Sequence, residues 1–486
     1  MPDRAPLANR SATIELEPTA GVHRADRERP GMALAVIVTC TLMLILDATV
    51  MNVALPRIRS DLGFSATGLA WVMSGYTLSF GGLLLLGGRA GDILGRRRVF
   101  LAGIALFTAA SLAGGLAPTA GWLLAARVAQ GVGAAAAGPN TIALIATTFT
   151  DARERIRALA LMSGVASAAF AVGLIVGGLL TQLGSWRWVL FINVPFGAAA
   201  LALTRRFVRE PARHPARLDL AGAVTATVGV AALVYAMLHA AEAGWSNAHT
   251  VVPLAAGAAC VAAFLAVEAR VSAPMLPLRL FADRNRAAGY ANFFLGPAAM
   301  MSTFFFLTQF LQNLRGYSAL TTGLAFLPMA AGMFSMTRLV PRLLGRFGPK
   351  PLAVTGSLLM VAGLLWLTRL HPGTHYLTGI LGPMAVLGVG GGLGFVPINP
   401  VVMADVPPAD AGAAGGTLQT MQQLGGTVGL GVLVTVYGTV LRGSGTGPVG
   451  TVHGMTTAFM VAAAIAAATV PIALTFRRVR EAGSAN

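Results

Sequence analysis

The sequence contains little charge for its length. Only 11% of its 486 residues are charged, whereas a soluble globular chain carries roughly 25%. Lysine occurs once, at Lys350, and the acidic residues number 18, so almost all of the positive charge is arginine. Too few charged side chains are present to cover a water-facing surface of this length. The composition therefore excludes a soluble globular protein and favours one embedded in lipid.

The sequence also lacks the residue patterns of enzymes and metal sites. Its two cysteines, Cys40 and Cys260, lie inside apolar runs, where buried small hydrophobic side chains are expected and a disulfide framework is not. We find no phosphate-binding loop, no His and Cys group at metal-ligand spacing, and no nucleophile elbow. These absences predict that the chain is not an enzyme, holds no metal or other cofactor, and does not hydrolyse ATP.

Apolar residues gather instead in long runs, such as Met32 to Leu46 and Met455 to Thr475. A bilayer core of about 30 Å needs about 20 residues of α-helix, so runs of this length predict spanning helices. We therefore predict an all-α polytopic membrane protein with fourteen spans. The spans are predicted at residues 32–55, 69–88, 99–118, 122–147, 159–182, 188–204, 218–238, 250–267, 288–312, 320–340, 351–369, 376–403, 412–438 and 453–475.

The positive residues indicate how these helices are oriented. With the N-terminus in the cytoplasm, 28 of the 35 Lys and Arg residues fall in cytoplasmic tails and loops, and six fall in loops outside the cell. The remaining one, Arg127, lies within a predicted span. This bias satisfies the positive-inside rule. We predict a protein of the cell (plasma or inner) membrane with cytoplasmic tails at 1–31 and 479–486, since residues 1–31 lack the apolar core of a signal peptide. The formal charge of +17 reflects this topology and predicts no nucleic-acid partner.

Two stretches of the sequence resemble each other. The letters TGLA occur at residues 67–70 and again 255 residues later at 322–325, and each opens a predicted span that ends in a basic loop. In these loops Gly95 corresponds to Gly348 and Gly103 to Gly356, at a separation of 253 residues. We predict two six-helix halves, at 32–217 and 270–478, with two inserted spans at 218–269. Duplicated halves are typical of secondary transporters, whose substrate site lies between the halves.

Asp47 is the one acidic residue well inside a predicted span. A carboxylate at this depth is costly, so it is either functional or hydrogen-bonded to a neighbouring helix. Burial disfavours the charged form of a carboxyl and a nearby cation favours it, which would let such a group bind and release a proton as the protein changes shape. Arg127, near the outer end of the fourth span, either extends to the membrane surface or faces the interior and modulates the acid.

The segment from Gly88 to Arg98 is the strongest local signal. Gly88 and Gly91 are expected to permit close helix approach. Asp92 ends the second span and is expected to accept bonds from a partner helix or an arginine, and so to hold the cytoplasmic side closed. Topology alone explains the basic residues here, but not an acid set among them. The predicted gating residues are Gly88, Gly91, Asp92, Gly95, Arg96 and Arg97.

With these residues the chain resembles the major facilitator superfamily, and within it the fourteen-helix drug:proton antiporters of the QacA/EmrB type, from about residue 32 to 478. Residues 88–98 resemble the superfamily's signature loop, and LDATVMNVALP at 46–56 resembles the first-helix motif of this subgroup. RVAQGVG at 127–133 is similar to the fourth-helix motif linked to proton transfer, and SWRW at 185–188 with NVP at 193–195 to the link between helices five and six. The resemblance implies the major facilitator fold with two extra helices, and proton coupling through Asp47 and Arg127.

Two positions depart from the pattern of this family. The fifth-helix antiporter motif has a Gly-Pro pair before two further glycines, whereas here Leu174 follows Gly173 and precedes Gly177 and Gly178. The missing proline weakens the inference of antiport specifically. Gly345 stands where the second-half loop often has an aspartate, which predicts halves that gate unequally.

The leading hypothesis is secondary active export of a small hydrophobic or amphipathic, drug-like compound by proton antiport, carried out by a monomer whose partners are lipid, protons and substrate. A uniporter or proton symporter of a small metabolite on the same fold stays an alternative, encouraged by Leu174. A membrane sensor or embedded enzyme is disfavoured because the sequence shows no extramembrane domain. Asn52, Phe304 and Gln309 are candidates for the substrate cavity, although an aromatic run that faces lipid would explain Phe304 equally well.

Overall fold

The computed structural model describes residues 30–476, apart from residues 66, 150, 212–219, 272–273, 275, 405, 407–410 and 446. Within this part of the chain every regular element is a helix, which confirms the all-α prediction. The predicted tails at 1–31 and 479–486 lie outside the described residues except for Pro30 and Gly31, and so does the predicted boundary at 217/218. The division of the chain into segments stays a prediction.

The helices follow one another with short connections. Those of the first half are α1 (Pro30–Leu62), α2 (Ala70–Leu94), α3 (Arg96–Gly115), α4 (Ala120–Thr148), α5 (Ala152–Leu183), α6 (Trp188–Phe191) and α7 (Asn193–Phe207). The inserted pair is α8 (Leu220–Ala243) and α9 (Ala248–Glu268). Those of the second half are η1 (Leu278–Phe281), α10 (Arg284–Gln309), η2 (Phe310–Leu314), α11 (Ala319–Ala325), α12 (Leu327–Phe347), α13 (Pro349–Leu367), α14 (Tyr376–Gly379), α15 (Leu381–Phe395), α16 (Ile398–Met403), α17 (Ala411–Ser444) and α18 (Pro448–Leu474).

Thirteen of the described helical stretches are long and apolar enough to cross a membrane. The long helix that is not among them is α4, whose 29 residues include the polar Arg127, Gln130 and Asn140. All three side chains are buried, and α4 packs along α2 and α3 inside the same bundle. With α4 the structure has the fourteen spans that the sequence predicts. The polar residues of α4 therefore belong to the interior of the protein.

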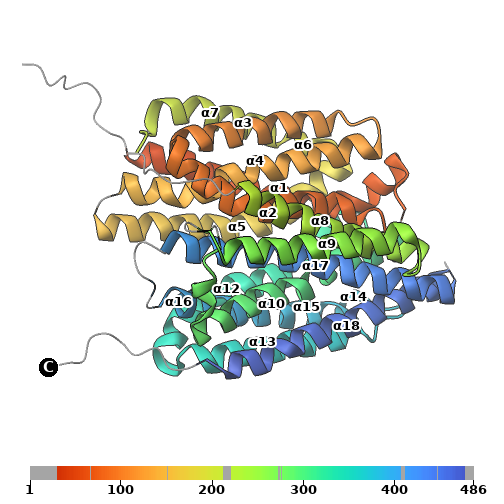
Figure 1. Ribbon diagram of the computed structural model, residues 1–486. Helices are drawn as coiled ribbons and strands as arrows, with labels where there is room; N and C mark the ends of the chain where they lie inside the picture. Colours follow the sequence, from red (N-terminus) through yellow and green to blue (C-terminus); the bar gives the residue numbers. More distant parts are fainter. Residues whose placement is uncertain are drawn as a thin grey trace, which may run out of the picture.

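The helices lie roughly side by side, and their packing separates the two halves (Figure 1). Helices α1–α7 pack mainly on one another, as do α10–α18. The halves meet where α2 packs on α17 and where α5 packs on α11, while α8 contacts both α2 and α17 and carries α9 on its other side. We call the end of the bundle that holds Pro30 and Phe476 the terminal face, and the other end the opposite face. Successive spans alternate between them.

The internal repeat has the same structural role in both halves. Gly95 links α2 to α3 with a φ of 109°, and Gly348 links α12 to α13 with a φ of 75°. Only glycine adopts such positive values at little cost, so each helix can follow the last without a longer loop. Gly103 then lies tight against the backbone of α4, and Gly356 against that of α15. The two halves thus share one structural frame, as the repeat predicts.

The helix ends differ from the predicted spans in two ways. Helix α1 continues to Leu62, past the predicted end at residue 55 and past Pro56. Several predicted single spans are broken into shorter helices, at the starts of α7, α12, α15 and α16. Each break has a proline within the first three residues of the new helix or directly before it: Pro195, Pro328, Pro383 and Pro397. Proline lacks the N–H that would continue the preceding helix, which explains the breaks.

Candidate functional site

A fully buried ion pair lies inside the first half. A guanidinium nitrogen of Arg127 on α4 lies 2.6 Å from Oδ2 of Asp47 on α1, and both side chains have 0% exposure. Arg127 also donates through Nε to the carbonyl of Val72 on α2, at 3.0 Å. Of the two alternatives that the sequence left for Arg127, the structure shows the one in which it faces the interior. An ion pair removed from water persists only when its geometry is good and its other polar atoms are also bonded.

Two amide side chains complete the carboxylate's hydrogen bonds. Gln130 donates to Oδ1 of Asp47 at 3.1 Å, while its own oxygen accepts from Arg127 at 2.9 Å. Asn193, at the start of α7, donates to the same Oδ1 at 2.8 Å. Gln130 also donates to the hydroxyl of Ser111 on α3, at 2.7 Å. Side chains of α4 and α7 therefore bond to Asp47 of α1. All of these donors would lose their acceptor, in whole or in part, if the carboxylate became neutral.

Tyr76 on α2 lies between this network and a cavity. The guanidinium carbon of Arg127 lies 4.4 Å from the centre of the Tyr76 ring, a cation–π arrangement that stabilises a buried cation. The same residue lines the cavity. One nitrogen of Arg127, Nη2, has no hydrogen-bond partner among the described residues, so the ring supplies part of its stabilisation. Tyr76 thus touches the charged pair and forms part of the wall of the space where a ligand would bind.

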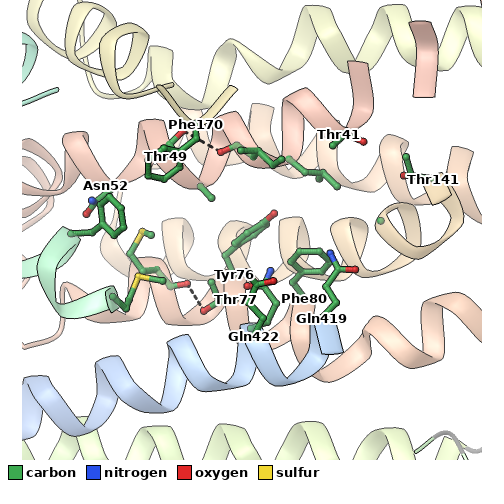
Figure 2. Close-up of a pocket in the computed structure, with 18 of the residues that line it drawn as sticks. Thr41, Thr49, Asn52, Tyr76, Thr77, Phe80, Thr141, Phe170, Gln419 and Gln422 are labelled. Atoms are coloured by element: carbon green, nitrogen blue, oxygen red, sulfur yellow. Dashed lines mark hydrogen bonds between the residues drawn. The ribbon is translucent and has the colours of Figure 1, made fainter. Parts of the chain in front are cut away.

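The cavity has a volume of about 440 Å³ and lies between the two halves. This size falls within the range of small-molecule sites. Its wall is built from α1, α2, α4 and α5 of the first half and from α10 and α17 of the second (Figure 2). The apolar part of the lining is rich in methionine and aromatic side chains: Met73, Phe80, Met162, Phe170, Met301 and Phe304. The polar part is formed by threonine, asparagine and glutamine, and none of the lining residues is charged.

The cavity is closed toward the opposite face by contacts of α5 with α11. A side-chain carbon on Gly178 would lie 2.6 Å from Cα of Leu320, and one on Gly323 would overlap the carbonyl oxygen of Leu174. The backbones of the two halves therefore touch directly here. The structure thus shows a cavity that the contact of α5 with α11 closes toward the opposite face.

The glycines of the fifth-helix motif pack this same helix onto α1. A side-chain carbon on Gly177 would lie 2.8 Å from Cα of Val50, and one on Gly173 would overlap the side chain of Thr49. Leu174 replaces the family's proline, and α5 runs unbroken from Ala152 to Leu183. The buried side chain of Leu174 lines the cavity. The three glycines therefore set the position of α5 against both halves of the protein.

The predicted gating residues lie at the terminal face, between α2 and α3. Asp92 of α2 pairs at 2.6 Å with Arg96, the first residue of α3, so its described partner is an arginine. Arg97 donates from its guanidinium to the carbonyl of Arg205 at 2.7 Å and from its backbone to Glu210 at 3.0 Å. Glu210 thereby caps the N-terminus of α3, where a negative charge is favoured. Sequence reasoning did not assign this role to Glu210.

Close helix approach occurs one residue away from one of the predicted positions. A side-chain carbon on Gly91 would overlap Asn140 of α4, and one on Gly87 would overlap the backbone of Ala135. On Gly88 it would lie 3.5 Å from Pro139, which is an ordinary contact distance. Gly91 therefore makes the close approach to α4 that was expected, whereas Gly88 meets α4 at an ordinary distance, because residues 87 and 91 follow each other on one face of the helix.

Of the three candidate cavity residues, the structure places two in the lining. Asn52 and Phe304 line the cavity, and Phe304 packs on Phe170 and Phe326 at ring-centre distances of 5.5 Å. The aromatic run therefore faces protein and not lipid. Gln309 is buried outside the cavity, with its amide directed at the carbonyl of Phe305, 3.5 Å away on its own helix. Sequence reasoning missed the polar wall of α17, although polar residues in an apolar span are its signal.

The fold and the buried site define a membrane transporter of two related halves. A family model of the Major Facilitator Superfamily matches residues 37–430, and the chain belongs to this family. Solved structures share the fold at low sequence identity: a POT family peptide transporter has a TM-score of 0.68 at 16% identity, over 93% of this chain and 99% of the other. A D-xylose-proton symporter has a TM-score of 0.66 at 14% identity, over 92% and 98%.

Two relatives are similar in sequence over most of their length. The cephamycin export protein CmcT of Amycolatopsis lactamdurans is 42% identical over 417 residues, which cover 84% of this chain and 86% of that protein. The puromycin resistance protein pur8 of Streptomyces alboniger is 42% identical over 452 residues, which cover 90% of both chains. The protein is therefore a transporter and not an enzyme, and the relatives it resembles are named for export and resistance.

Proposed function

We propose that the protein exports an amphipathic, drug-like or antibiotic-like compound from the cytoplasm in exchange for protons. The observation that carries this proposal is the buried Asp47–Arg127 pair, which lies behind Tyr76 at the wall of a cavity between the halves. The relatives named for cephamycin export and puromycin resistance support the class of substrate. No cofactor enters the proposal, because a proton gradient supplies the energy to a single chain.

The pair gives protonation a direct structural effect. A proton on Asp47 would remove the negative partner of Arg127, and leaving one buried charge unpaired costs about 3–5 kcal/mol. The amides of Gln130 and Asn193 would lose part of their acceptor at the same time. The protein would relieve this cost by adopting a conformation in which Arg127 finds water or another partner. Protonation would thus shift the balance between the two conformations of the transporter.

The direction of transport follows from the orientation that the positive residues predict. With the terminal face in the cytoplasm, the contact of α5 with α11 closes the cavity toward the outside, as expected for the state in which an exporter takes up its substrate. We propose on the same ground that both termini lie in the cytoplasm and that the membrane is the plasma or inner membrane. A reporter fused after Asn486 that is active only outside the cell would contradict this orientation.

The test of exchange uses the purified protein in liposomes, with a pH-sensitive dye inside and a panel of hydrophobic antibiotics and dyes as substrates. Antiport predicts that adding substrate to one side releases protons on that side, and that an imposed pH gradient concentrates the substrate. Symport predicts proton movement with the substrate, and uniport predicts none. Leu174 in place of the motif proline keeps uniport as the second candidate. Substrate flux that does not change with the pH gradient would indicate uniport.

A further inference from the structure

One face of α17 presents three amide side chains to the cavity. Gln419, Gln422 and Gln423 are spaced as i, i+3 and i+4, which places them on the same side of a helix, and all three line the cavity. Figure 2 shows Gln419 and Gln422 beside Phe80 and Tyr76. None of the three amides has a hydrogen bond to another residue of the described chain. Amides in a membrane-spanning helix are costly without partners, so a bound molecule is the natural partner.

The other polar groups of the wall are engaged elsewhere. The hydroxyls of Thr41, Thr49 and Thr141 donate to carbonyls of their own helices, and that of Thr77 bonds to Thr427 at 2.6 Å. Two exceptions remain. Asn52 is 3% exposed and its Nδ2 has no partner among the described residues, and Tyr76 lines the cavity without a hydrogen bond from its hydroxyl to another described residue. Figure 2 places Asn52 at the far end of the cavity from Gln419. Free amide groups therefore stand at both ends of an apolar space.

The cavity offers no counter-charge to a charged ligand. Its lining contains no Asp, Glu, Lys or Arg, and Asp47 and Arg127 neutralise each other behind Tyr76. A permanent cation would lose its hydration on entering and gain no opposite charge in return. An amide, in contrast, both donates and accepts. It can therefore bond to a carbonyl, hydroxyl or amide group of an uncharged molecule.

We infer that Gln419, Gln422, Gln423 and Asn52 select uncharged amphipathic substrates that carry carbonyl, hydroxyl or amide groups on an aromatic or aliphatic body. The glutamines bind the polar groups, and the side chains of Phe80, Phe170 and Phe304 bind the apolar body. This inference rests on the proposed export function and names its substrate class. It also predicts discrimination against compounds with a fixed positive charge.

The test compares two aromatic probes on the full-length protein in lipid nanodiscs. Chloramphenicol is uncharged and carries amide and hydroxyl groups, whereas ethidium is a permanent cation. We expect the parent protein to bind chloramphenicol at least about tenfold more tightly than ethidium, and Gln422→Leu to weaken chloramphenicol binding about tenfold. Gln422→Glu should tighten ethidium binding about tenfold or more, because it supplies the missing counter-charge.

The matched control is Gln309→Leu, which removes a buried amide that lies outside the cavity, and it should leave binding of both probes unchanged. Each variant is compared with the parent by thermal unfolding, so that a misfolded protein is recognised. Equal binding of both probes by the parent, binding of neither probe, or unchanged ethidium binding in Gln422→Glu would overturn the inference. Proton-driven transport is measured separately in liposomes. Transport of ethidium driven by a pH gradient would refute the substrate class and leave the export function standing.

Discussion

The two halves of this transporter share a frame but differ in the chemistry of their interiors. The first half holds the buried pair of Asp47 and Arg127. The second half, at 270–478, contains three acidic residues in its sequence: Asp283, which precedes α10, and Asp405 and Asp410, which lie outside the described residues. Its contribution to the cavity is uncharged: the glutamines of α17 with Met301 and Phe304 of α10. The two halves thus have equivalent folds, but only the first contributes a buried ion pair, and the second contributes uncharged side chains to the cavity.

This difference separates proton coupling from substrate recognition in space. The proton site would lie within one half, where it can act even when the halves move apart. The cavity is made by both halves, so its shape changes whenever they move. Tyr76 is the residue that belongs to both regions. Substitutions in the pair, in the contact between the halves and in Tyr76 should therefore have distinguishable effects, and these can be measured separately.

The largest effect is expected for Asp47→Asn, which removes the proton-binding group and keeps its size. We expect uphill export driven by a pH gradient to fall by roughly 100-fold or more, since the site can no longer change its charge. Substrate binding should persist, because Asp47 does not line the cavity. Flux in liposomes with and without a pH gradient, together with binding in detergent, measures both. A variant that still concentrates substrate would place proton coupling elsewhere.

The next largest effect is expected for Gly323→Val, which blocks contact between the halves. The added side chain would overlap the carbonyl oxygen of Leu174, so closure at the opposite face should become unfavourable. A cost of about 1–3 kcal/mol for overpacking predicts a roughly tenfold to 100-fold loss of transport. Gly345→Val on the adjoining helix, where a side chain meets no atom within 4 Å, is the control and should transport nearly normally. Cysteine accessibility at the opposite face would report the shift.

An intermediate effect is expected for Tyr76→Leu, which acts where the charged pair and the cavity meet. It removes the ring from Arg127 and a wall from the cavity, and a cation–π contact in a desolvated site is worth about 2 kcal/mol. We expect about a tenfold loss of proton-driven export. Tyr76→Phe keeps the ring and should retain most activity. The two variants are compared by substrate flux against external pH. An equal loss in both would show that the hydroxyl, and not the ring, is used, and parent activity in both would show that neither is.

The smallest effect is expected for Asp92→Asn at the terminal face. Asp92 pairs with Arg96 at the start of α3 and is partly exposed, so its loss should cost little stability. We expect transport to fall about fivefold if the charge also stabilises the closed terminal face in the other conformation. Arg98→Gln in the same loop serves as the control. Transport by a well-expressed Asp92→Asn protein at the parent rate would leave the loop a marker of topology alone.

The sequence predicted the fold well because its signals are strong and local. Long apolar runs, the positive-inside bias and the glycines at 95 and 348 each follow from the bilayer or from backbone geometry. It identified Asp47 and Arg127 by their depth, but their contact joins residues 80 positions apart. Asn193 and Glu210 could not be assigned, because their partners lie on other helices. Gln309 lies outside the cavity lining, and a helical position alone does not say whether a side chain faces the cavity.

The inserted helices give the two joints between the halves unequal surroundings. Helix α8 covers the joint of α2 with α17, where Thr227 lies against Gly82 and Thr435 bonds to the carbonyl of Met237. The joint of α5 with α11 and α12 has no such covering helix among the described residues. A molecule dissolved in the bilayer therefore meets a joint that α8 covers on one side of the protein, and on the other side the uncovered joint of α5 with α11 and α12. We expect lipid-soluble substrates to enter sideways, past α5 and α12, and not only from water.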